Sequence, residues 1–102
     1  MTRILLKSLD RTGAPPLEIS ERLRGQLVYF AAPPGSADAP PLGDQEYWFR
    51  PDEVARILED GVFYLVSPLD TAKLSELELT DEQEVLLEWL KARGVRHARV
   101  EE

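Results

Sequence analysis

The sequence predicts an α+β fold, a two-layer sandwich in which two main amphipathic helices cover one face of a mixed four- to five-stranded sheet. Three observations lead to this prediction. The length of 102 residues suits one compact core and is too short for two. Two segments carry helix patterns with start and stop signals, and several others have the apolar or alternating patterns of strands. We therefore expect residues 1–102 to form a single domain.

Five segments have the residue patterns of strands. Residues 3–9 divide apolar and polar side chains between two sides, and residues 95–100 alternate, as in half-buried strands. Residues 27–32 and 62–66 are apolar throughout and rich in strand-forming residues, which predicts two strands at the centre of the sheet. Residues 46–49 are interpreted as a short strand or an aromatic lead-in to the next helix.

The first main helix is expected to follow Arg50, which occupies the cap position. Pro51 suits the first helical position, and the acidic residues after it favour the positive end of the helix dipole. Gly61 provides the stop. The apolar residues share one face: Val54, Ile57 and Leu58.

The second main helix has the clearest signals in the chain. Thr80 and Gln83 have the spacing of a capping box, and Gly94 followed by Val95 suits a C-terminal cap. The helix is expected to be about thirteen residues long. Its apolar stripe is predicted to consist of Val85, Leu86, Trp89 and Leu90.

Three segments are less regular. The pattern of residues 17–24 is ambiguous. A helical turn capped by Ser20 is one possibility, and Gly25 is expected to end it. Residues 71–77 are interpreted as a short helix capped by Asp70, with a competing strand pattern over residues 77–79. Residues 33–45 contain four prolines and two glycines, which predicts a flexible surface loop, either functional or slack.

The charge of the chain is unevenly distributed. The net charge is −7, and residues 51–90 hold eleven acidic side chains against two basic ones, whereas residues 91–102 carry +2. An acidic surface repels nucleic-acid phosphates and anionic lipid, so generic nucleic-acid binding is disfavoured. The acidic segment is interpreted as solvated helix faces or as a docking face for a basic partner.

The residue inventory offers little for catalysis. There is no cysteine and one histidine, His97, and phosphate-binding glycine patterns and nucleophile elbows are absent. Acid pairs such as Asp52 with Glu53, or Asp60 near Tyr64, lie at helix ends, where carboxylates are usually structural. We expect no catalytic residues, no cofactor and no metal. The apolar runs are too short for a membrane span or a secretion signal.

Residues 49–58 include Glu53-Val54-Ala55 and Ile57-Leu58, and in these residues the segment resembles the first helix of MerR-like or excisionase-like helix-turn-helix domains. The resemblance covers ten positions. It implies a nucleic-acid-associated regulator. Such families continue with a tight turn into a basic helix, whereas Gly61 here leads into an apolar segment.

The leading hypothesis is a small, acidic, cytoplasmic accessory or regulatory protein that binds another protein. Candidate partner-binding residues are the aromatics beside the proline-rich loop and two arginines near the C-terminus: Tyr47, Trp48, Phe49, Arg96 and Arg99. One alternative is a nucleic-acid-associated regulator that uses the basic C-terminal segment. Another is a small ligand-binding protein or hydrolase with a pocket formed by Tyr29, Tyr64 and Asp60.

Overall fold

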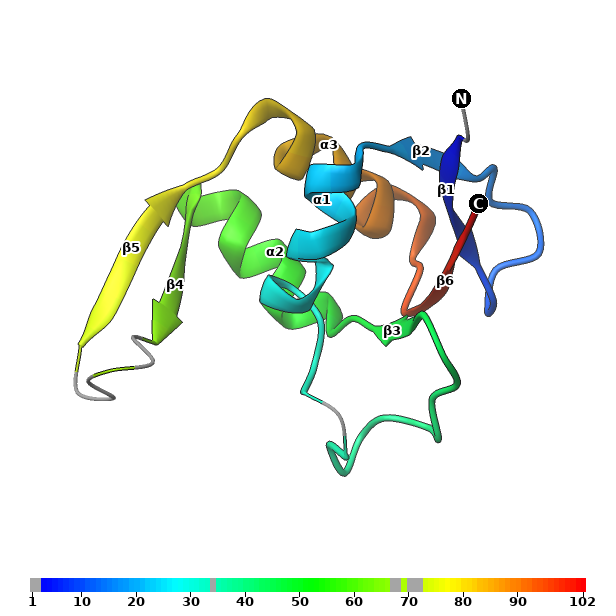
Figure 1. Cartoon of the computed structure of the whole chain (residues 1–102), viewed down its shortest axis with the longest axis horizontal. Coiled ribbons are helices and arrows are strands. Elements are labelled where there is room, and N and C mark those ends of the chain that lie inside the picture. The colour runs from blue at the N-terminus through cyan, green and yellow to red at the C-terminus, as the bar shows by residue number, and fades with distance from the viewer. Residues whose placement is uncertain (1–2, 34, 67–68, 70–72) are drawn as a thin grey trace.

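The structure, a computed structural model, describes residues 3–33, 35–66, 69 and 73–102. Figure 1 shows a sheet at one end of the molecule, helices beside it, and a two-stranded hairpin at the opposite end. The elements in chain order are β1 (Ile4–Ser8), β2 (Leu17–Ile19), α1 (Glu21–Gln26), the 3₁₀ helix η1 (Leu27–Tyr29), β3 (Glu46–Trp48), α2 (Pro51–Asp60), β4 (Val62–Val66), β5 (Leu74–Glu78), α3 (Asp81–Arg93) and β6 (His97–Glu101). The predicted α+β class is confirmed.

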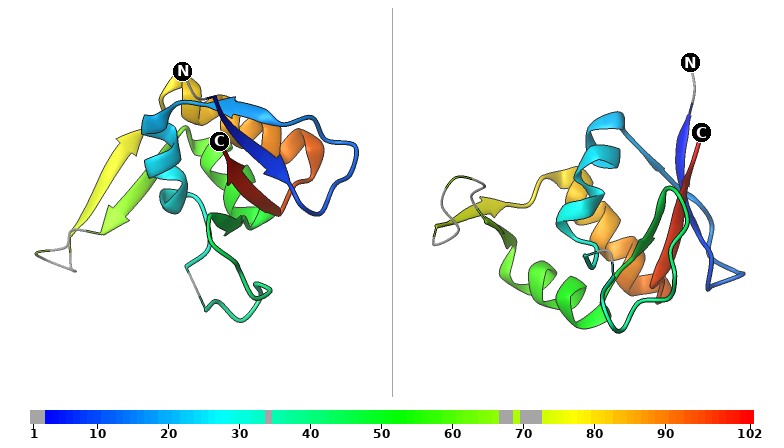
Figure 2. Two further views of the ribbon diagram at one scale, coloured as in Figure 1. Left: turned by 45° about the vertical axis from the view of Figure 1, so that its right-hand side comes forward. Right: turned by 60° about the horizontal axis from the view of Figure 1, so that its bottom comes forward.

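The main sheet has four strands in the order β2-β1-β6-β3. All three of its pairings are antiparallel, so the sheet differs in this detail from the mixed sheet that we expected. Leu6 pairs with Leu17 on one side and Val100 on the other, and Tyr47 pairs with Ala98. Because side chains alternate along a strand, these residues share the face that lies against the helices. The other face carries no helix in Figure 2.

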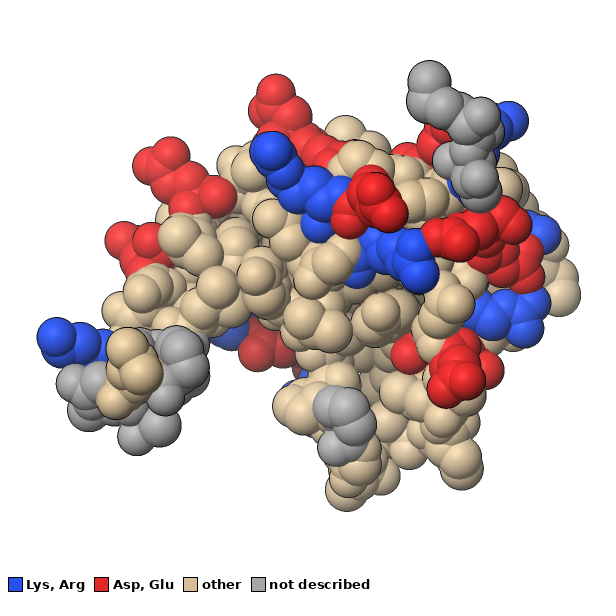
Figure 3. Space-filling view, viewed as in Figure 1, with Lys and Arg blue, Asp and Glu red and all other residues tan. Residues whose placement is uncertain are grey.

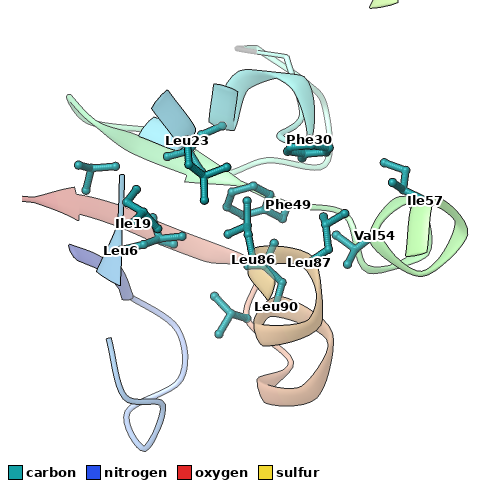
Figure 4. Close-up of a cluster of buried hydrophobic side chains, with 14 of the residues drawn as sticks. Leu6, Ile19, Leu23, Phe30, Phe49, Val54, Ile57, Leu86, Leu87 and Leu90 are labelled. Carbon is teal, nitrogen blue, oxygen red and sulfur yellow. The ribbon is translucent and has the colours of Figure 1, made fainter. Parts of the chain in front are cut away.

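The helices lie on one side of this sheet, as the right-hand view of Figure 2 shows. Figure 4 shows Phe49 in the middle of the core, between Leu23 and Phe30 on one side and Leu86 and Leu87 on the other. Phe49, Leu23, Leu86 and Leu87 are fully buried. Each such side chain stabilises the fold by about 1.5–3 kcal/mol relative to its exposed state. The core therefore joins α1, α3 and the segment between β3 and α2.

Both main helices begin and end where the sequence indicates. Pro51 is the first residue of α2, and Gly61 ends it with a φ of 73°. In α3, the Thr80 side chain accepts a hydrogen bond from the Gln83 amide while the Gln83 side chain accepts one from the Thr80 amide. Gly94 ends α3 with a φ of 66°. Both glycines occupy the left-handed region, which other residues adopt at a cost.

The apolar stripe of α3 is rotated slightly from the predicted one. Leu86 and Leu90 are buried and Trp89 is half-buried, as expected. The prediction for Val85 was wrong, because its side chain is 52% exposed, and Leu87 lies in the core instead. The buried side of α3 is centred between Leu86 and Leu87, so the side chain of Val85 lies outside it.

The strand predicted over residues 27–32 does not form. Helix α1 continues through Gly25 to Gln26, and residues 27–29 then form η1. The prediction that Gly25 ends the helix was therefore wrong. Leu27 and Phe30 are buried, whereas Val28 is 61% exposed. Burial at positions i and i+3 is the spacing of a helix, and together with the buried Leu23 it continues the inward face of α1.

The strand over residues 62–66 forms but is not central. It is β4, and in the described part of the chain it pairs only with β5, as an antiparallel hairpin that projects away from the main sheet (Figure 1). Residues 74–78 form β5, so among the described residues the helix predicted over 71–77 is wrong. The competing strand pattern at 77–79 is confirmed for Leu77 and Glu78, whereas Leu79 follows the strand. The expected cap Asp70, and Ser67-Pro68 after β4, lie outside the described residues.

Candidate interaction surfaces

The three aromatic residues predicted to bind a partner point in different directions. Phe49 is fully buried, so it belongs to the core and is not available to a partner. Tyr47 is half-buried and pairs with Ala98 on the helix-covered face of the sheet. Trp48 pairs with His97 on the uncovered face, and its indole N–H donates to Asp38 across 3.4 Å. Only Trp48 therefore lies where a partner could contact it from the open side of the sheet.

The proline-rich loop is held to this face by Asp38. No helix or strand forms among its described residues, as its composition predicts, while its flexibility stays a prediction. Arg50 donates two hydrogen bonds of 3.0 Å to the two carboxylate oxygens of Asp38. These bonds lower the pKa of Asp38 from 3.8 to about 2, with a smaller contribution from Trp48. The middle of the loop is thus attached to the residues on either side of Phe49.

The two arginines predicted to bind a partner do not form a basic patch. Arg99 forms an ion pair with Glu101, and the same carboxylate lies 2.8 Å from the ammonium of Lys7. Lys7 and Arg99 together lower the pKa of Glu101. Arg96 is exposed outside β6, and its amide donates to Asp10 across 3.1 Å. The positive charge of Arg99 is therefore partly neutralised by its own strand.

His97 pairs with a carboxylate on the uncovered face. Its Nε2 lies 2.7 Å from Oε1 of Glu46, and its ring and that of Trp48 are arranged edge to face at a centroid distance of 6.1 Å. Within the described ranges, no three histidine or acidic side chains gather closely enough to hold a metal ion. The uncovered face is a set of paired charges around one histidine and one tryptophan.

The residues proposed for a ligand pocket do not converge. Tyr29 stacks on Phe63 at a centroid distance of 6.0 Å, on one face of the hairpin. Tyr64 follows Phe63 in β4 and therefore points to the other face. Its hydroxyl donates to Glu76 across 3.2 Å, which raises the pKa of the phenol. Asp60 raises the pKa of Tyr64 further through its charge, but Tyr29 lies on the opposite side of the strand.

The continuation of α2 differs from that of a helix-turn-helix domain. After Gly61 the chain enters β4 directly, and the next helix is the acidic α3. The first-helix resemblance of residues 49–58 therefore does not extend to a recognition helix behind α2.

An apolar surface that we did not predict lies where the hairpin meets η1. Phe63 is buried between Tyr29 and Phe30, at centroid distances of 6.0 and 5.0 Å. Leu77 is its partner in the hairpin register, and Leu65 lies two residues further along the same face of β4. The exposed or half-buried apolar residues of η1 and of the hairpin face that carries Phe63 are here named the hairpin patch: Val28, Tyr29, Leu65 and Leu77.

The hairpin patch is open to solvent. Val28 is 61% exposed, Tyr29 41% and Leu77 38%, and all residues of β5 are exposed. Figure 3 shows uncharged residues over the surface between the hairpin and the short helices, with acidic side chains along the margin of that area. The sequence contains part of the signal for this surface, because an apolar segment that folds as a helix buries one side and exposes apolar residues on the other, here Val28 and Tyr29. The strand predicted for residues 27–32 concealed this signal.

A polar clamp between α1 and α3 was also missed. The Glu82 carboxylate accepts from the amide of Ser20 across 3.0 Å and from its hydroxyl across 2.6 Å. The hydroxyl of Ser20 also accepts from the Leu23 amide and so caps α1. Beside this clamp, the buried Gln83 donates to the side chain of Gln26 across 3.0 Å. These bonds fix the two helices that carry the hairpin and η1.

No family model, no curated protein and no solved structure matches this chain in the comparisons with known proteins. None of the described helices is both long and apolar enough to span a membrane.

Proposed function

We propose that this protein is a small acidic accessory or regulatory module of the cytoplasm that acts by binding another protein. The hairpin patch is the observation that carries this proposal. Exposed apolar side chains that form one contiguous surface are typical of interaction sites, whereas scattered ones are normal on any protein. Here Tyr29, Leu65 and Leu77 surround a single buried ring, that of Phe63.

The shape of the hairpin supports the same function. In the described part of the chain, β4 and β5 each have one neighbouring strand, so each presents one edge without a strand partner. A two-stranded hairpin gains little stability by itself and benefits when a further surface packs on it. The residues that anchor it to the body are Phe63 and the two aromatic rings of Tyr29 and Phe30. A partner that covers the hairpin patch would bury apolar area on both η1 and the hairpin.

The nucleic-acid alternative has less support. The cations of the uncovered sheet face are paired with carboxylates, as Arg99 and Lys7 are with Glu101. Binding to phosphate requires clustered lysine and arginine side chains that are free to release counterions. We therefore favour a protein partner.

Affinity purification of the tagged chain from a native lysate at mild salt tests this function. The patch variant combines Val28→Thr with Leu77→Thr. Threonine keeps the branched shape of the valine in η1 and is compatible with the strand at position 77, but it removes apolar surface at both positions. Its matched control is Leu9→Thr with Val85→Thr, since Leu9 is 40% and Val85 52% exposed on other parts of the molecule. All four positions are exposed, so each change should alter the free energy of unfolding by about 0.5 kcal/mol or less.

We expect wild type and control to retain the same protein partner, identified by mass spectrometry, and the patch variant to lose it. The ratio of nucleic-acid to protein absorbance in the eluate distinguishes the alternative class. Elution without a partner, equal retention by all three proteins, or an eluate rich in nucleic acid would each argue against the proposed function.

A further inference from the structure

A groove runs between α2 and α3, on elements that take no part in the hairpin patch. The two helices pack side by side and run antiparallel (Figure 1). The groove has a volume of about 830 Å³, and its apolar lining consists of Ala55 and Leu58 from α2 and Ala92 from α3. Because two of these side chains are single methyl groups, a third element can approach both helices closely.

The rim of this groove is acidic. Glu59, Glu84 and Glu88 line it, and Lys91 lies toward its other end. None of the three carboxylates forms an ion pair with another residue of the described ranges. Glu84 and Glu88 are one helical turn apart, a spacing at which like charges repel each other. A cationic group placed in the groove would relieve this repulsion.

The length of the groove matches a short helix. Along α3 it extends from Glu84 to Ala92, which is about 12 Å at the rise of an α-helix, or about two turns. A third helix laid between two antiparallel helices packs as in a helical bundle and presents small or apolar residues to the groove at helical spacing. Its flanking positions would face Glu59 on one side and Glu84 and Glu88 on the other.

We propose that the groove between α2 and α3 binds a basic amphipathic helix of a partner protein. The apolar side of that helix contacts Ala55, Leu58 and Ala92. Its lysine or arginine side chains contact the rim carboxylates. The net charge of the rim, three carboxylates against the single ammonium of Lys91, selects a basic helix over an acidic one.

The test uses a synthetic helical peptide of alanine, leucine and lysine, about 14 residues long and thus about four turns. Its counterpart has glutamate in place of every lysine. Amide chemical shifts of the isotope-labelled full chain report where each peptide binds. We expect the basic peptide to shift the amides around Ala55, Leu58 and Ala92, with weaker binding at high salt, and the acidic counterpart to shift none.

Two variants locate the contact. Glu84→Gln with Glu88→Gln should weaken binding of the basic peptide about tenfold. The matched control, Glu21→Gln with Asp44→Asn, makes the same change in net charge at exposed sites outside the groove and should leave the affinity within about twofold. Ala92→Phe fills the groove from an exposed position and should abolish binding while the thermal midpoint stays unchanged.

Several results would overturn the proposal: equal binding of both peptides, equal weakening by the two double variants, or shifts that map outside the groove. Self-association of the chain that Ala92→Phe abolishes would show that a second copy covers the groove, which also contradicts it. The hairpin-patch variant should bind the peptide as wild type does, so this inference can fail while the proposed function holds.

Discussion

Asp38 attaches the middle of the proline-rich loop to the body of the protein. Composition predicts that residues 33–45 avoid helix and strand, because proline donates no backbone hydrogen bond. It does not predict which loop residue meets Arg50, since that pairing depends on how the chain folds back beside Trp48. The two bonds from Arg50 are nevertheless specific, because two nitrogen atoms of the guanidinium face the two oxygen atoms of the carboxylate.

The pKa of Asp38 provides the first prediction. A nuclear magnetic resonance titration of its side-chain carboxyl should give a midpoint at about 2 in the wild type. In Arg50→Gln the midpoint should rise toward the ordinary value of 3.8, because the main cause of the lowered pKa is removed. The ion pair of Asp38 with Arg50 is therefore complete above about pH 4 and is lost as the pH falls through about 2.

Arg56→Gln is the control for this titration, since Arg56 pairs with Glu53 and not with Asp38. The Asp38 midpoint should stay at about 2 in that variant. A shift of equal size in the two arginine variants would mean that overall charge, and not the Arg50 contact, sets the pKa.

Glu82 provides the second prediction, because its carboxylate joins α3 to the cap of α1. Glu82→Gln keeps the shape but weakens two hydrogen bonds to a charged acceptor, and should lower the free energy of unfolding by about 1 kcal/mol. Asp81→Asn, in the same first turn, should cost about 0.5 kcal/mol or less, since it loses only a favourable position near the helix dipole. Urea unfolding measures both, and equal losses would contradict the clamp.

At the scale of elements, the sequence predicted what depends on neighbouring residues. The ends of α2 and α3 follow from Pro51, Gly61, the Thr80–Gln83 box and Gly94, all of which act within one or two turns. The apolar run at residues 27–32 was predicted wrongly. A short apolar run fits a buried strand and a helix equally well, and burial of Leu23, Leu27 and Phe30 against α3 and the hairpin decides between them.

Two glycines test this assignment and provide the third prediction. Gly25 lies inside α1, with open space around its missing side chain and no left-handed backbone, so Gly25→Ala should raise the free energy of unfolding by about 0.5–1 kcal/mol. Gly61 also has open space but a φ of 73°, so Gly61→Ala should lower it by about 1 kcal/mol. Thermal unfolding followed by circular dichroism measures both changes. A loss of stability in Gly25→Ala would mean that the helix does end at this glycine.

At the scale of the whole molecule, the fold class could be predicted but the surfaces could not. Trp48 is the one aromatic candidate on the uncovered face, because Phe49 was needed to fill the core. The position of β4 outside the main sheet exposes Leu77 and leaves the ring of Phe63 to be covered by Tyr29. Which strands pair is a long-range property that short-range patterns do not contain. The hairpin patch is a consequence of this pairing.

Amide hydrogen exchange of the full chain, alone and with its captured partner, tests the role of the hairpin patch most directly. We predict that the partner slows exchange at η1 and along the hairpin, and leaves the rates of β1 and β6 unchanged. Protection confined to the uncovered sheet face, or no protection at the hairpin, would contradict a binding surface centred on Phe63.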